Sequence, residues 1–231
     1  MKFPWFSDVP ADHLSAVRDL SLSKLVRDHL QAMILRGDLI AGQRINEPDV
    51  AAELGISRVP VREALRELES TGLVVSRKHA GVFVRQPDGA EITDLYAMRG
   101  LFDGFAGRCV ASQVKAARVP VADELDASIK LMKAAAAKHE VQRYYSENLR
   151  FHWMIVEAAK NRVLTSSYRD VVQKLHVSRL KNLSQDLGMR VSIEEHVEIA
   201  GAIRRGNAVR SEALSAGHVS SAYARLTRIG T

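Results

Sequence analysis

Gly55 separates two short helical patterns and so constrains the fold of the region around it more than any other single residue. Apolar residues recur at helical spacing in Val50–Leu54, and Gly55 follows them at the position where a left-handed residue closes a helix. A second helical pattern begins after Ser57, whose side chain is expected to cap it by accepting a backbone N–H. Two short helices joined by such a tight turn predict a helix-turn-helix, whose second helix enters the DNA major groove.

The second helix of this motif has one apolar face and one basic face. The apolar residues recur at helical spacing and are predicted to be buried: Val61, Ala64, Leu65 and Leu68. Arg58, Arg62 and Arg66 recur every fourth residue on another face. Guanidinium groups match guanine edges and phosphates, but a row of arginines can equally be a solvated helix face. Spacing alone therefore leaves both interpretations open.

A wing is expected directly after the motif. Gly72 ends the second helix, Val74–Val75 begins an extended run, and Val82–Val84 returns as a second short strand. The turn between them, Arg77–Gly81, is basic and contains a glycine, which lets the backbone approach another molecule closely. Such a tip can reach the DNA minor groove. The combination favours DNA binding over a merely solvated row of arginines.

These residues resemble a known family. The segment SRVPVREALRELESTGLV, with LRGDLIAGQRINEPDVAAELGI upstream, is similar to the winged helix-turn-helix of the GntR family of bacterial transcriptional regulators, from Leu22 to Arg85. Val59 stands where the family often has threonine. The resemblance implies that Arg58 and Arg62 contact base edges and phosphates. The full set of implied DNA-binding residues is Ser57, Arg58, Val59, Arg62, Arg66, Arg77, His79 and Gly81.

Composition and charge restrict the class of protein. The 231 residues are enough for one large or two modest domains with a buried core. The net charge is +6, but residues 1–86 contribute only +1, so the DNA-binding interpretation rests on local clustering of basic residues. The sequence has no apolar run long enough to span a membrane and no recognisable secretory signal. The single cysteine, Cys109, fits a reducing cytoplasm, where we expect the protein to act.

The sequence predicts a mainly α fold in two domains after an N-terminal arm. The arm is residues 1–21, the winged helix-turn-helix domain is 22–86, and the second domain is 87–231. Short connections between its helices predict an antiparallel all-α helical bundle. The first of these connections is placed at Arg118–Pro120, because proline often interrupts a helix. The expected helices are 90–112, 121–138, 141–160, 163–185, 191–205 and 208–228.

Three histidines of the second domain are placed to converge. Asn148 and His152 are four residues apart on one helix face. His196 and His218 lie about ten and eleven residues from the turn at Gly206–Asn207, so at ~1.5 Å per residue their imidazoles reach one level of the helical hairpin. Imidazole-rich sites suit Zn²⁺, Ni²⁺ and neighbouring divalent metals. Each histidine taken alone is more often a surface residue or a satisfied core residue.

The region Gly89–Arg228 resembles the FCD ligand-binding domain of the FadR subfamily of GntR regulators. Members with a metal site use three histidines and one aspartate, which lies four residues before the first histidine. This chain has all three histidines, in Phe151-His152, Glu195-His196 and Gly217-His218. The carboxylate position is Asn148, whose neutral amide oxygen is a weaker ligand. The resemblance implies a divalent transition metal, Zn or Ni, bound by Asn148, His152, His196 and His218.

Two further residues are candidates for effector binding. Leu95–Asp103 is similar to the first helix of that domain, whose arginine, here Arg99, often faces the cavity. A guanidinium binds a carboxylate through two parallel hydrogen bonds, so Arg99 can clamp a carboxylate effector. An ion pair between Arg99 and Asp103, four residues on, is an equally good interpretation. His176 can line the same cavity or lie at the surface.

The combined expectation is a homodimeric bacterial regulator, a repressor, that binds double-stranded operator DNA and is not an enzyme. A small carboxylate bound near the metal would bias the orientation of the two DNA-binding domains. The homodimer follows from the family resemblance and from the two-fold half-sites that helix-turn-helix proteins read. Two alternatives stay open: a metal sensor without an organic effector, and a metalloenzyme in which Glu195, beside His196, would be the candidate base.

Overall fold

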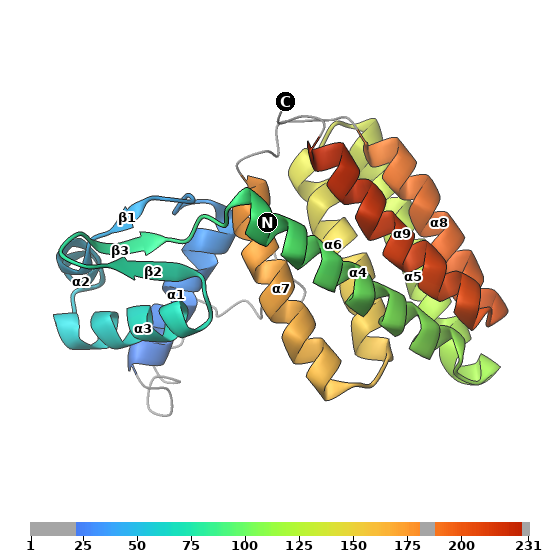
Figure 1. Cartoon of the computed structure of the whole chain (residues 1–231), viewed down its shortest axis with the longest axis horizontal. Helices are drawn as coiled ribbons and strands as arrows, with labels where there is room; N and C mark the ends of the chain where they lie inside the picture. The colour runs from blue at the N-terminus through green and yellow to red at the C-terminus, as the bar shows by residue number, and fades with distance from the viewer. Residues whose placement is uncertain (1–21, 181–187, 228–231) are drawn as a thin grey trace. The chain divides into compact units, whose positions relative to one another are not determined.

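The structure is a computed structural model that describes residues 22–180 and 188–227. They form two compact units (Figure 1). One unit runs to Pro87 and takes in the end of α7 (Arg162–Leu180) from Gln173 onward, while the other begins at Asp88. The predicted arm and the predicted continuation of α7 to residue 185 lie outside the described residues. Within the described residues, no helix is both long and apolar enough to cross a membrane.

The first unit is a winged helix-turn-helix. The strands form an antiparallel sheet in the order β1-β3-β2, with Val75 opposite Phe83 and Ile45 opposite Val82. The two predicted wing strands are confirmed. The sequence does not predict β1, because two residues are too few to show an alternating pattern. The elements are α1 (Leu22–Arg36), β1 (Arg44–Ile45), α2 (Glu47–Leu54), α3 (Arg58–Ser70), β2 (Val74–Arg77) and β3 (Gly81–Val84).

The helix-turn-helix forms around one apolar core. The apolar face of α3 is buried as predicted, in a cluster with α1 residues such as Leu30 and Ile34. Gly55 closes α2 in the left-handed region, with φ of 65°. Ser57 occupies the N-cap position of α3, but its side chain makes no cap hydrogen bond, contrary to the prediction. Because this residue is exposed, water can satisfy the first N–H groups of α3 in place of the hydroxyl.

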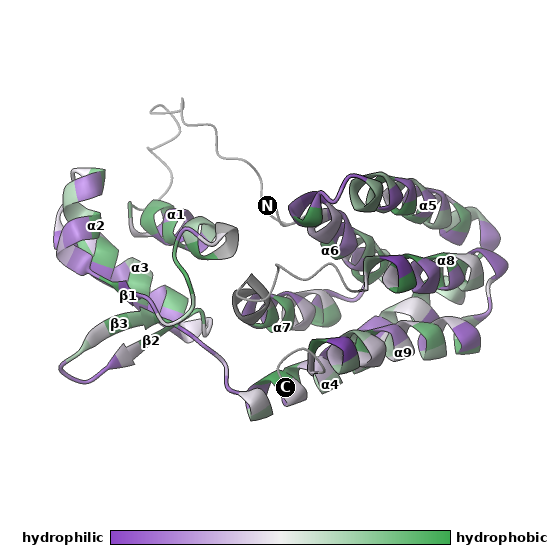
Figure 2. Ribbon diagram, turned by 90° about the horizontal axis from the view of Figure 1, so that it is seen from above, coloured by the Kyte–Doolittle hydropathy of each residue, from purple (hydrophilic) through white to green (hydrophobic). Residues whose placement is uncertain are grey.

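The second unit confirms the predicted antiparallel helical bundle. α4 packs on α9, α6 and α8, whereas α5 packs on α6 and α8. Figure 2 shows α8 between α5 and α9, with hydrophilic and hydrophobic residues on different faces of these helices. The bundle helices are α4 (Gly89–Ala111), α5 (Lys115–Ala137), α6 (Val141–Ala158), α7, α8 (Met189–Arg205) and α9 (Ala208–Thr227). Four of them, α4, α6, α8 and α9, therefore surround one interior.

α5 begins earlier than predicted. The helix starts at Lys115 and continues through Pro120, so the predicted break at Arg118–Pro120 is wrong. Proline has a φ that suits a helix and costs one intrahelical hydrogen bond at this position. The guanidinium of Arg118 stabilises the region, because it donates to the backbone oxygens of Gln113 (2.9 Å) and Arg204 (3.4 Å). These bonds tie the beginning of α5 to the end of α8.

α4 and α9 approach each other closely because α4 presents glycines to its neighbour. Gly100, Gly104 and Gly107 all face residues of α9. A Cβ atom on Gly107 would lie 2.7 Å from Oγ of Ser215 and 2.9 Å from Oγ of Ser211, which is too close for a relaxed contact. The short distance between α4 and α9 places the buried face of α4, which carries Arg99 and Asp103, against the interior of the bundle.

Gly107→Ala is expected to destabilise the protein by about 1–3 kcal/mol, because an added methyl group forces a close-packed helix contact apart. Gly217→Ala is the matched control, since a Cβ on Gly217 in α9 would meet no atom within 4 Å. Alanine favours a helix over glycine, so this variant should be unchanged or more stable by up to about 1 kcal/mol. Urea unfolding followed by circular dichroism measures both. Equal stability of the two variants would contradict the close contact.

Candidate DNA-binding surface and metal centre

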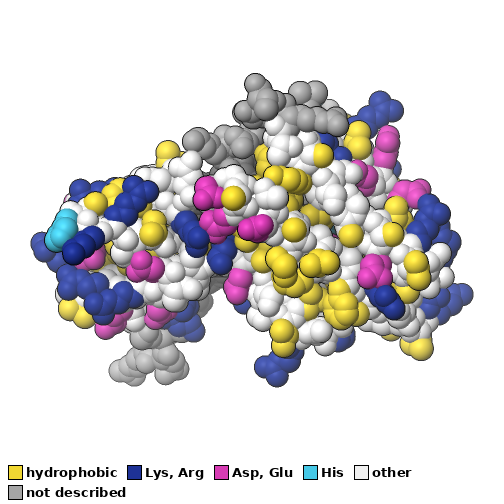
Figure 3. Space-filling view, viewed as in Figure 1, with side chains coloured by type: hydrophobic (Ala, Val, Ile, Leu, Met, Phe, Trp, Pro, Cys, Tyr) yellow, Lys and Arg dark blue, Asp and Glu magenta, His cyan; other side chains and the backbone are white. Residues whose placement is uncertain are grey.

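The basic face of α3 is exposed. Arg58, Arg62 and Arg66 are all exposed, and the neighbouring Val59 has 62% of its surface exposed. Figure 3 shows Lys and Arg side chains gathered over the winged helix-turn-helix unit. Arg62 pairs with Glu47 of α2, with 3.2 Å between Nε and Oε2. Glu47 therefore orients the central arginine of the row across the turn between the two helices.

The wing tip carries the other predicted DNA contacts. Arg77, His79 and Gly81 are exposed, and the last two have positive φ, 61° and 105°. The Arg77 guanidinium lies over the Phe83 ring, 4.6 Å from its centroid, in a cation–π contact. Arg44 of β1 also reaches the tip, since its Nε would lie 3.1 Å from a Cβ on Gly81. The sequence does not predict Arg44 as a contact, because a lone basic residue outside the motif has no informative spacing.

In the helical unit the three predicted histidines meet. The Nε2 atoms of His152 and His218 are 3.2 Å apart, and those of His152 and His196 are also 3.2 Å apart. The three side chains come from α6, α8 and α9, and at most 4% of each residue is exposed. The ring centroids of His196 and His218 are 4.5 Å apart, so these residues do lie at one level of the α8–α9 hairpin.

Carboxylates hold the outer nitrogens of two of these rings. Oδ1 of Asp103 on α4 lies 2.9 Å from Nδ1 of His152, and Oε2 of Glu195 lies 2.7 Å from Nδ1 of His218. Arg225 donates two hydrogen bonds to Glu195, at 3.1 and 3.0 Å. A carboxylate accepts a hydrogen bond, so each Nδ1 carries the proton and each Nε2 keeps a lone pair. Outer partners of this kind orient histidines that bind metals.

The third ring has a weaker outer partner. Nδ1 of His196 has no well-formed hydrogen bond among the described residues, although an interaction with the backbone of Ser192, one turn earlier, favours the charged form of the ring. The Phe151 ring packs edge-on against His196, with centroids 4.4 Å apart. A neutral His196 can therefore carry its one proton on either nitrogen.

Burial keeps the imidazoles neutral. It is the main cause that lowers the pKa of His152 to about 4, against the opposing attraction of Asp103. Burial also lowers the pKa of His196 well below its usual value and lowers that of His218. For Asp103, burial alone would raise the pKa, but the nearby His152 and Arg99 outweigh it and lower the pKa. Neutral imidazoles beside ionised carboxylates are in the protonation state that binds metals.

The protons of this cluster are too few for its acceptors. With both carboxylate-bound Nδ1 atoms protonated, Nε2 of His152 and Nε2 of His218 face each other as two lone pairs at 3.2 Å. A proton on Nε2 of His196 can satisfy only one of them. A buried acceptor without a partner is costly, whereas a cation could be bound by all three nitrogens. Nitrogens about 2.0–2.1 Å from a tetrahedral zinc lie about 3.3 Å from one another. The two 3.2 Å separations from His152 fit this value, and the ligand atoms of all three histidines lie within 4.8 Å of one another.

Asn148 is the fourth predicted ligand. Its side chain is buried, and its Nδ2 lies 3.3 Å from Nε2 of His196. The side-chain amide can rotate by half a turn, which exchanges its oxygen and its nitrogen. Oδ1 would then face the imidazoles. Asn148 is therefore placed to supply a neutral oxygen from one helical turn before His152.

Arg99 and Asp103 form a buried ion pair on α4. Nε of Arg99 lies 3.2 Å from Oδ2 of Asp103, and at most 3% of each side chain is exposed. The Tyr168 hydroxyl of α7 lies 3.3 and 3.4 Å from the two oxygens of Asp103. The ion-pair interpretation is confirmed, and the role of Arg99 as an effector clamp stays a prediction. So does that of His176, whose side chain lies outside the described part of the structure.

A groove in the α8–α9 face opens beside His218. It has a volume of about 760 Å³ and is lined by residues of α8 and α9 together with Lys133. Three of its lining residues are acidic: Glu194, Glu195 and Glu198. Each of these carboxylates is paired with an arginine, Glu194 with Arg190, Glu195 with Arg225 and Glu198 with Arg210. The groove therefore reaches His218 along a surface whose charges are balanced and favour neither a cation nor an anion.

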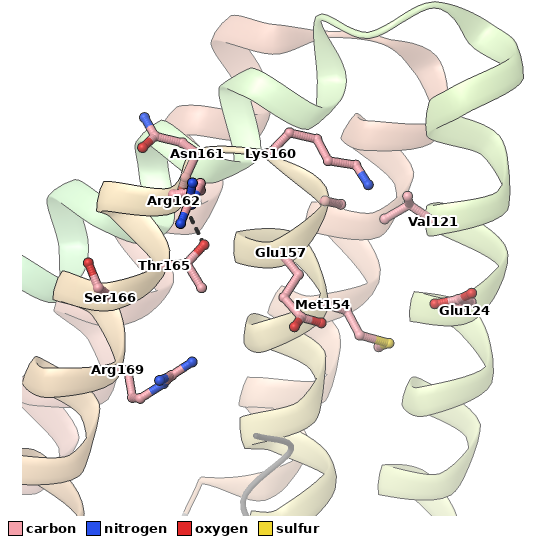
Figure 4. Close-up of a pocket in the computed structure, with 11 residues that line it drawn as sticks. Val121, Glu124, Met154, Glu157, Lys160, Asn161, Arg162, Thr165, Ser166 and Arg169 are labelled. Carbon is pink, nitrogen blue, oxygen red and sulfur yellow. Dashed lines mark hydrogen bonds between the residues drawn. The ribbon is translucent and has the colours of Figure 1, made fainter. Parts of the chain in front are cut away.

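A second pocket lies where α6 meets α7 (Figure 4). It has a volume of about 680 Å³ and contains none of the predicted site residues. Arg169 points across it toward α6, with its guanidinium 5.5 Å from the Trp153 ring centroid. Glu124 and Glu157 line the pocket together with the basic Arg162. Charges of both signs favour no single class of ligand, so the lining of this pocket indicates no function.

Asp103→Asn is expected to destabilise the protein by about 3–5 kcal/mol, because it leaves the Arg99 charge buried without its partner. The exposed pair Arg108–Glu212 provides the control, and Glu212→Gln should cost at most about 1 kcal/mol. Chemical unfolding of both variants, purified in the presence of a chelator, measures the difference. Two variants of equal stability would rule out the buried pair as a constraint on the bundle.

Comparison with known proteins covers both units. Residues 22–84 match the domain of bacterial regulatory proteins of the gntR family, and residues 94–221 match the FCD domain. Over 201 residues, and 87% of each chain, the sequence is 30% identical to a Paenarthrobacter nicotinovorans protein named as a probable D-xylose utilization operon transcriptional repressor. It is 26% identical to the Nta operon transcriptional regulator of Aminobacter aminovorans, over 68% of this chain and 72% of that one.

A solved structure shares the whole fold. E. coli McbR/YncC superposes with a TM-score of 0.76 at 18% identity, over 92% of this chain and 100% of that chain. At this identity the likeness concerns the fold alone. The domain matches and the relatives describe transcription regulators, not enzymes. The chain belongs to the GntR family of bacterial transcriptional regulators, in the FadR-like subfamily that carries an FCD domain.

Proposed function

We propose that this chain is a homodimeric repressor that binds double-stranded operator DNA in the cytoplasm, and that a divalent metal and a small carboxylate in its helical unit control this binding. One observation carries the proposal: three buried imidazoles converge while carboxylates hold two of their outer nitrogens. The name of the Paenarthrobacter relative, a transcriptional repressor, supports repression.

The proposed DNA contacts come from α3 and the wing. Arg58 and Arg62 read base edges and phosphates, while Arg66 and Ser57 fix the helix on the DNA backbone. The first N–H groups of α3, which the Ser57 side chain does not cap, offer a further site for a phosphate. The wing tip around His79 enters the minor groove. Sequence readout therefore rests on α3, and affinity rests on both elements.

The proposed metal is held by neutral ligands. Asp103 and Glu195 keep two rings in the tautomer that presents Nε2 to the centre of the cluster. Arg99 and Arg225 pair with these carboxylates and so offset their charge. Zn²⁺ or Ni²⁺ suits the four proposed ligands, which are His152, His196, His218 and Asn148.

A neutral ligand set favours an anionic effector. When bound, the ion would supply positive charge that the neutral ligands do not compensate, and a small hydroxy or sugar acid could bind to it. Arg99 is in contact with the same network through Asp103, which also holds His152. Its guanidinium would bind the carboxylate in exchange for part of its contact with Asp103. Burial of both residues excludes water from this exchange.

The site links four helices. His152 lies on α6, His196 on α8, His218 on α9, and the outer carboxylate of Asp103 on α4. A ligand that tightens these contacts fixes the packing of the bundle. In a homodimer this biases the relative orientation of the two DNA-binding units, which two-fold operator half-sites read directly.

A metal sensor without an organic effector is the second candidate. The buried ion pair between Arg99 and Asp103 favours it, because a guanidinium that is already paired is less available to a carboxylate effector. A metalloenzyme has no such support, since Glu195, the candidate base, is engaged by His218 and Arg225. The two regulator candidates differ in the effect that chelation alone has on DNA binding.

Protein purified without added metal is expected to contain about one equivalent of a transition metal per chain by elemental analysis. His152→Ala/His196→Ala should lose this metal, whereas His29→Ala, at an exposed histidine of α1, should keep it. Asn148→Asp should bind the metal more tightly, because a carboxylate replaces an amide. Metal that remains bound to the double variant would show that the metal binds at another place in the protein. If neither the native protein nor Asn148→Asp contained a metal, the proposed site would be refuted.

Operator binding is expected to respond to the bound ligands. A duplex selected by the native protein from a random-sequence library serves as the operator, and fluorescence anisotropy measures its affinity. Small hydroxy and sugar acids should release the metal-loaded protein from this duplex, because they bias the dimer away from the DNA-binding arrangement. Release by chelation alone, with no response to any acid, would support the metal sensor instead.

Two variants control this experiment. Arg62→Ala should lower operator affinity by about 1–3 kcal/mol if Arg62 reads a base. Arg190→Ala, at an arginine of α8 whose side chain is 93% exposed, should leave the affinity unchanged. An operator affinity that responds neither to acids nor to chelation would refute both regulator candidates while leaving the DNA-binding role in place.

A further inference from the structure

Val59 is an apolar residue exposed on the second helix of the helix-turn-helix. It lies in the first turn of α3, and 62% of its surface is exposed. The structure describes α3 from end to end, and Val59 is the only large apolar residue of this helix that is exposed. A β-branched side chain has one strongly preferred rotamer in a helix, so the two methyl groups of Val59 are held in a fixed direction.

The direction of Val59 follows from the buried face of α3. At about 100° per residue, Val59 lies about 170° from the centre of the four buried residues, so its side chain points away from the core. Arg62 follows Val59 by three residues and Arg66 follows it by seven, which places both on the same side of the helix. The outer face of α3 therefore combines one rigid apolar group with guanidinium groups.

The surroundings of Val59 favour DNA over another protein as the partner of this face. A protein interface has several apolar residues at its centre, and charged residues are depleted there. Val59 instead has no exposed large apolar neighbour on α3, and exposed arginines accompany it. A DNA major groove offers guanine edges and phosphates to the arginines and the 5-methyl group of thymine to the valine.

We propose that Val59 recognises the 5-methyl group of a thymine in each half-site of the operator. The inference rests on the DNA-binding role of α3 in the proposed function and names a base that this helix selects. Among the four bases, only thymine presents a methyl group in the major groove, whereas cytosine presents an amino donor. Valine can bond to neither a donor nor an acceptor, so a polar base edge that faces it loses water without replacement. Contact with the methyl group instead buries apolar surface on both molecules.

The spacing of Val59 and Arg62 predicts where the thymine lies. Three residues of a helix advance about 4.5 Å along its axis, and successive bases of one DNA strand are about 3.4 Å apart. The thymine is therefore expected about one or two base pairs from the base that Arg62 contacts. Glu47 pairs with Arg62 at 3.2 Å and so helps to keep the two residues in this arrangement.

Replacement of thymine by deoxyuridine tests the contact, because it removes the 5-methyl group and leaves the base-pairing edge unchanged. Each thymine of the selected operator is replaced in turn, and fluorescence anisotropy measures the affinity of the full chain. At one thymine position the native protein should lose about fourfold in affinity for each half-site replaced, because one methyl group leaves an apolar contact. Val59→Ala should bind the thymine and deoxyuridine duplexes within about 1.5-fold of each other, because its shorter side chain does not reach the methyl group.

Ile40→Ala is the matched control. Ile40 is also 62% exposed and lies in the same unit outside α3, so this variant should keep the native response to deoxyuridine. Circular dichroism should be native for both variants, because both residues are exposed. A selection from the random-sequence library with Val59→Ala should lose the preference for thymine at that one position. The preference at the base that Arg62 contacts should remain.

Two results would overturn the inference. One is a native protein that binds every deoxyuridine duplex as tightly as the thymine duplex. The other is a Val59→Ala variant that responds to deoxyuridine as strongly as the native protein, because another residue would then contact the methyl group. In both cases the effect of Arg62→Ala on operator affinity tests the proposed function separately. If the native protein selects no sequence from the library, the proposed function and this inference both fail.

Discussion

Two carboxylate–imidazole hydrogen bonds impose the constraint on which the chemistry of the helical unit depends. Asp103 holds a proton on the outer nitrogen of His152, and Glu195 does the same for His218. Because those protons are committed, two lone pairs meet in an interior where water is excluded. Burial opposes the alternative of a charged imidazole. The cluster thus differs from ordinary buried histidines, whose acceptors have donors. A bound cation would satisfy these lone pairs, which is the physical argument for the proposed metal.

Asn148 couples the proposed metal to the proposed effector. A carboxylate at this position would bind a divalent ion more strongly and cancel part of its charge, whereas the amide does neither. The neutral ligand set then binds the metal less tightly and leaves more attraction for an anion. Metal and anion would therefore stabilise each other's binding, which is reciprocal by thermodynamic necessity. Release of the anion would weaken the hold on the metal.

α4 contributes to two features of the bundle. Its glycines set the short distance to α9, and its buried Asp103 accepts a hydrogen bond from the ring of His152. The proposed metal site therefore depends on a helix that leaves no room for an added methyl group at Gly107.

Local patterns in the sequence by themselves determined the helix-turn-helix, the wing and the all-α bundle. A glycine that closes a helix, such as Gly55, and apolar residues at helical spacing are patterns that span only a few residues, so they can be recognised without knowledge of the tertiary structure. They also determined which histidines can meet, since equal offsets from one turn put two of them at the same level. They misplaced the start of α5 after Pro120, at residue 121, whereas the helix begins at Lys115 and contacts from Arg118 stabilise its first turns. Only the tertiary structure decided that Asp103 binds a histidine from another helix and that one face of α4 is left exposed. Those facts depend on how helices far apart in the sequence pack, and no local spacing encodes that packing.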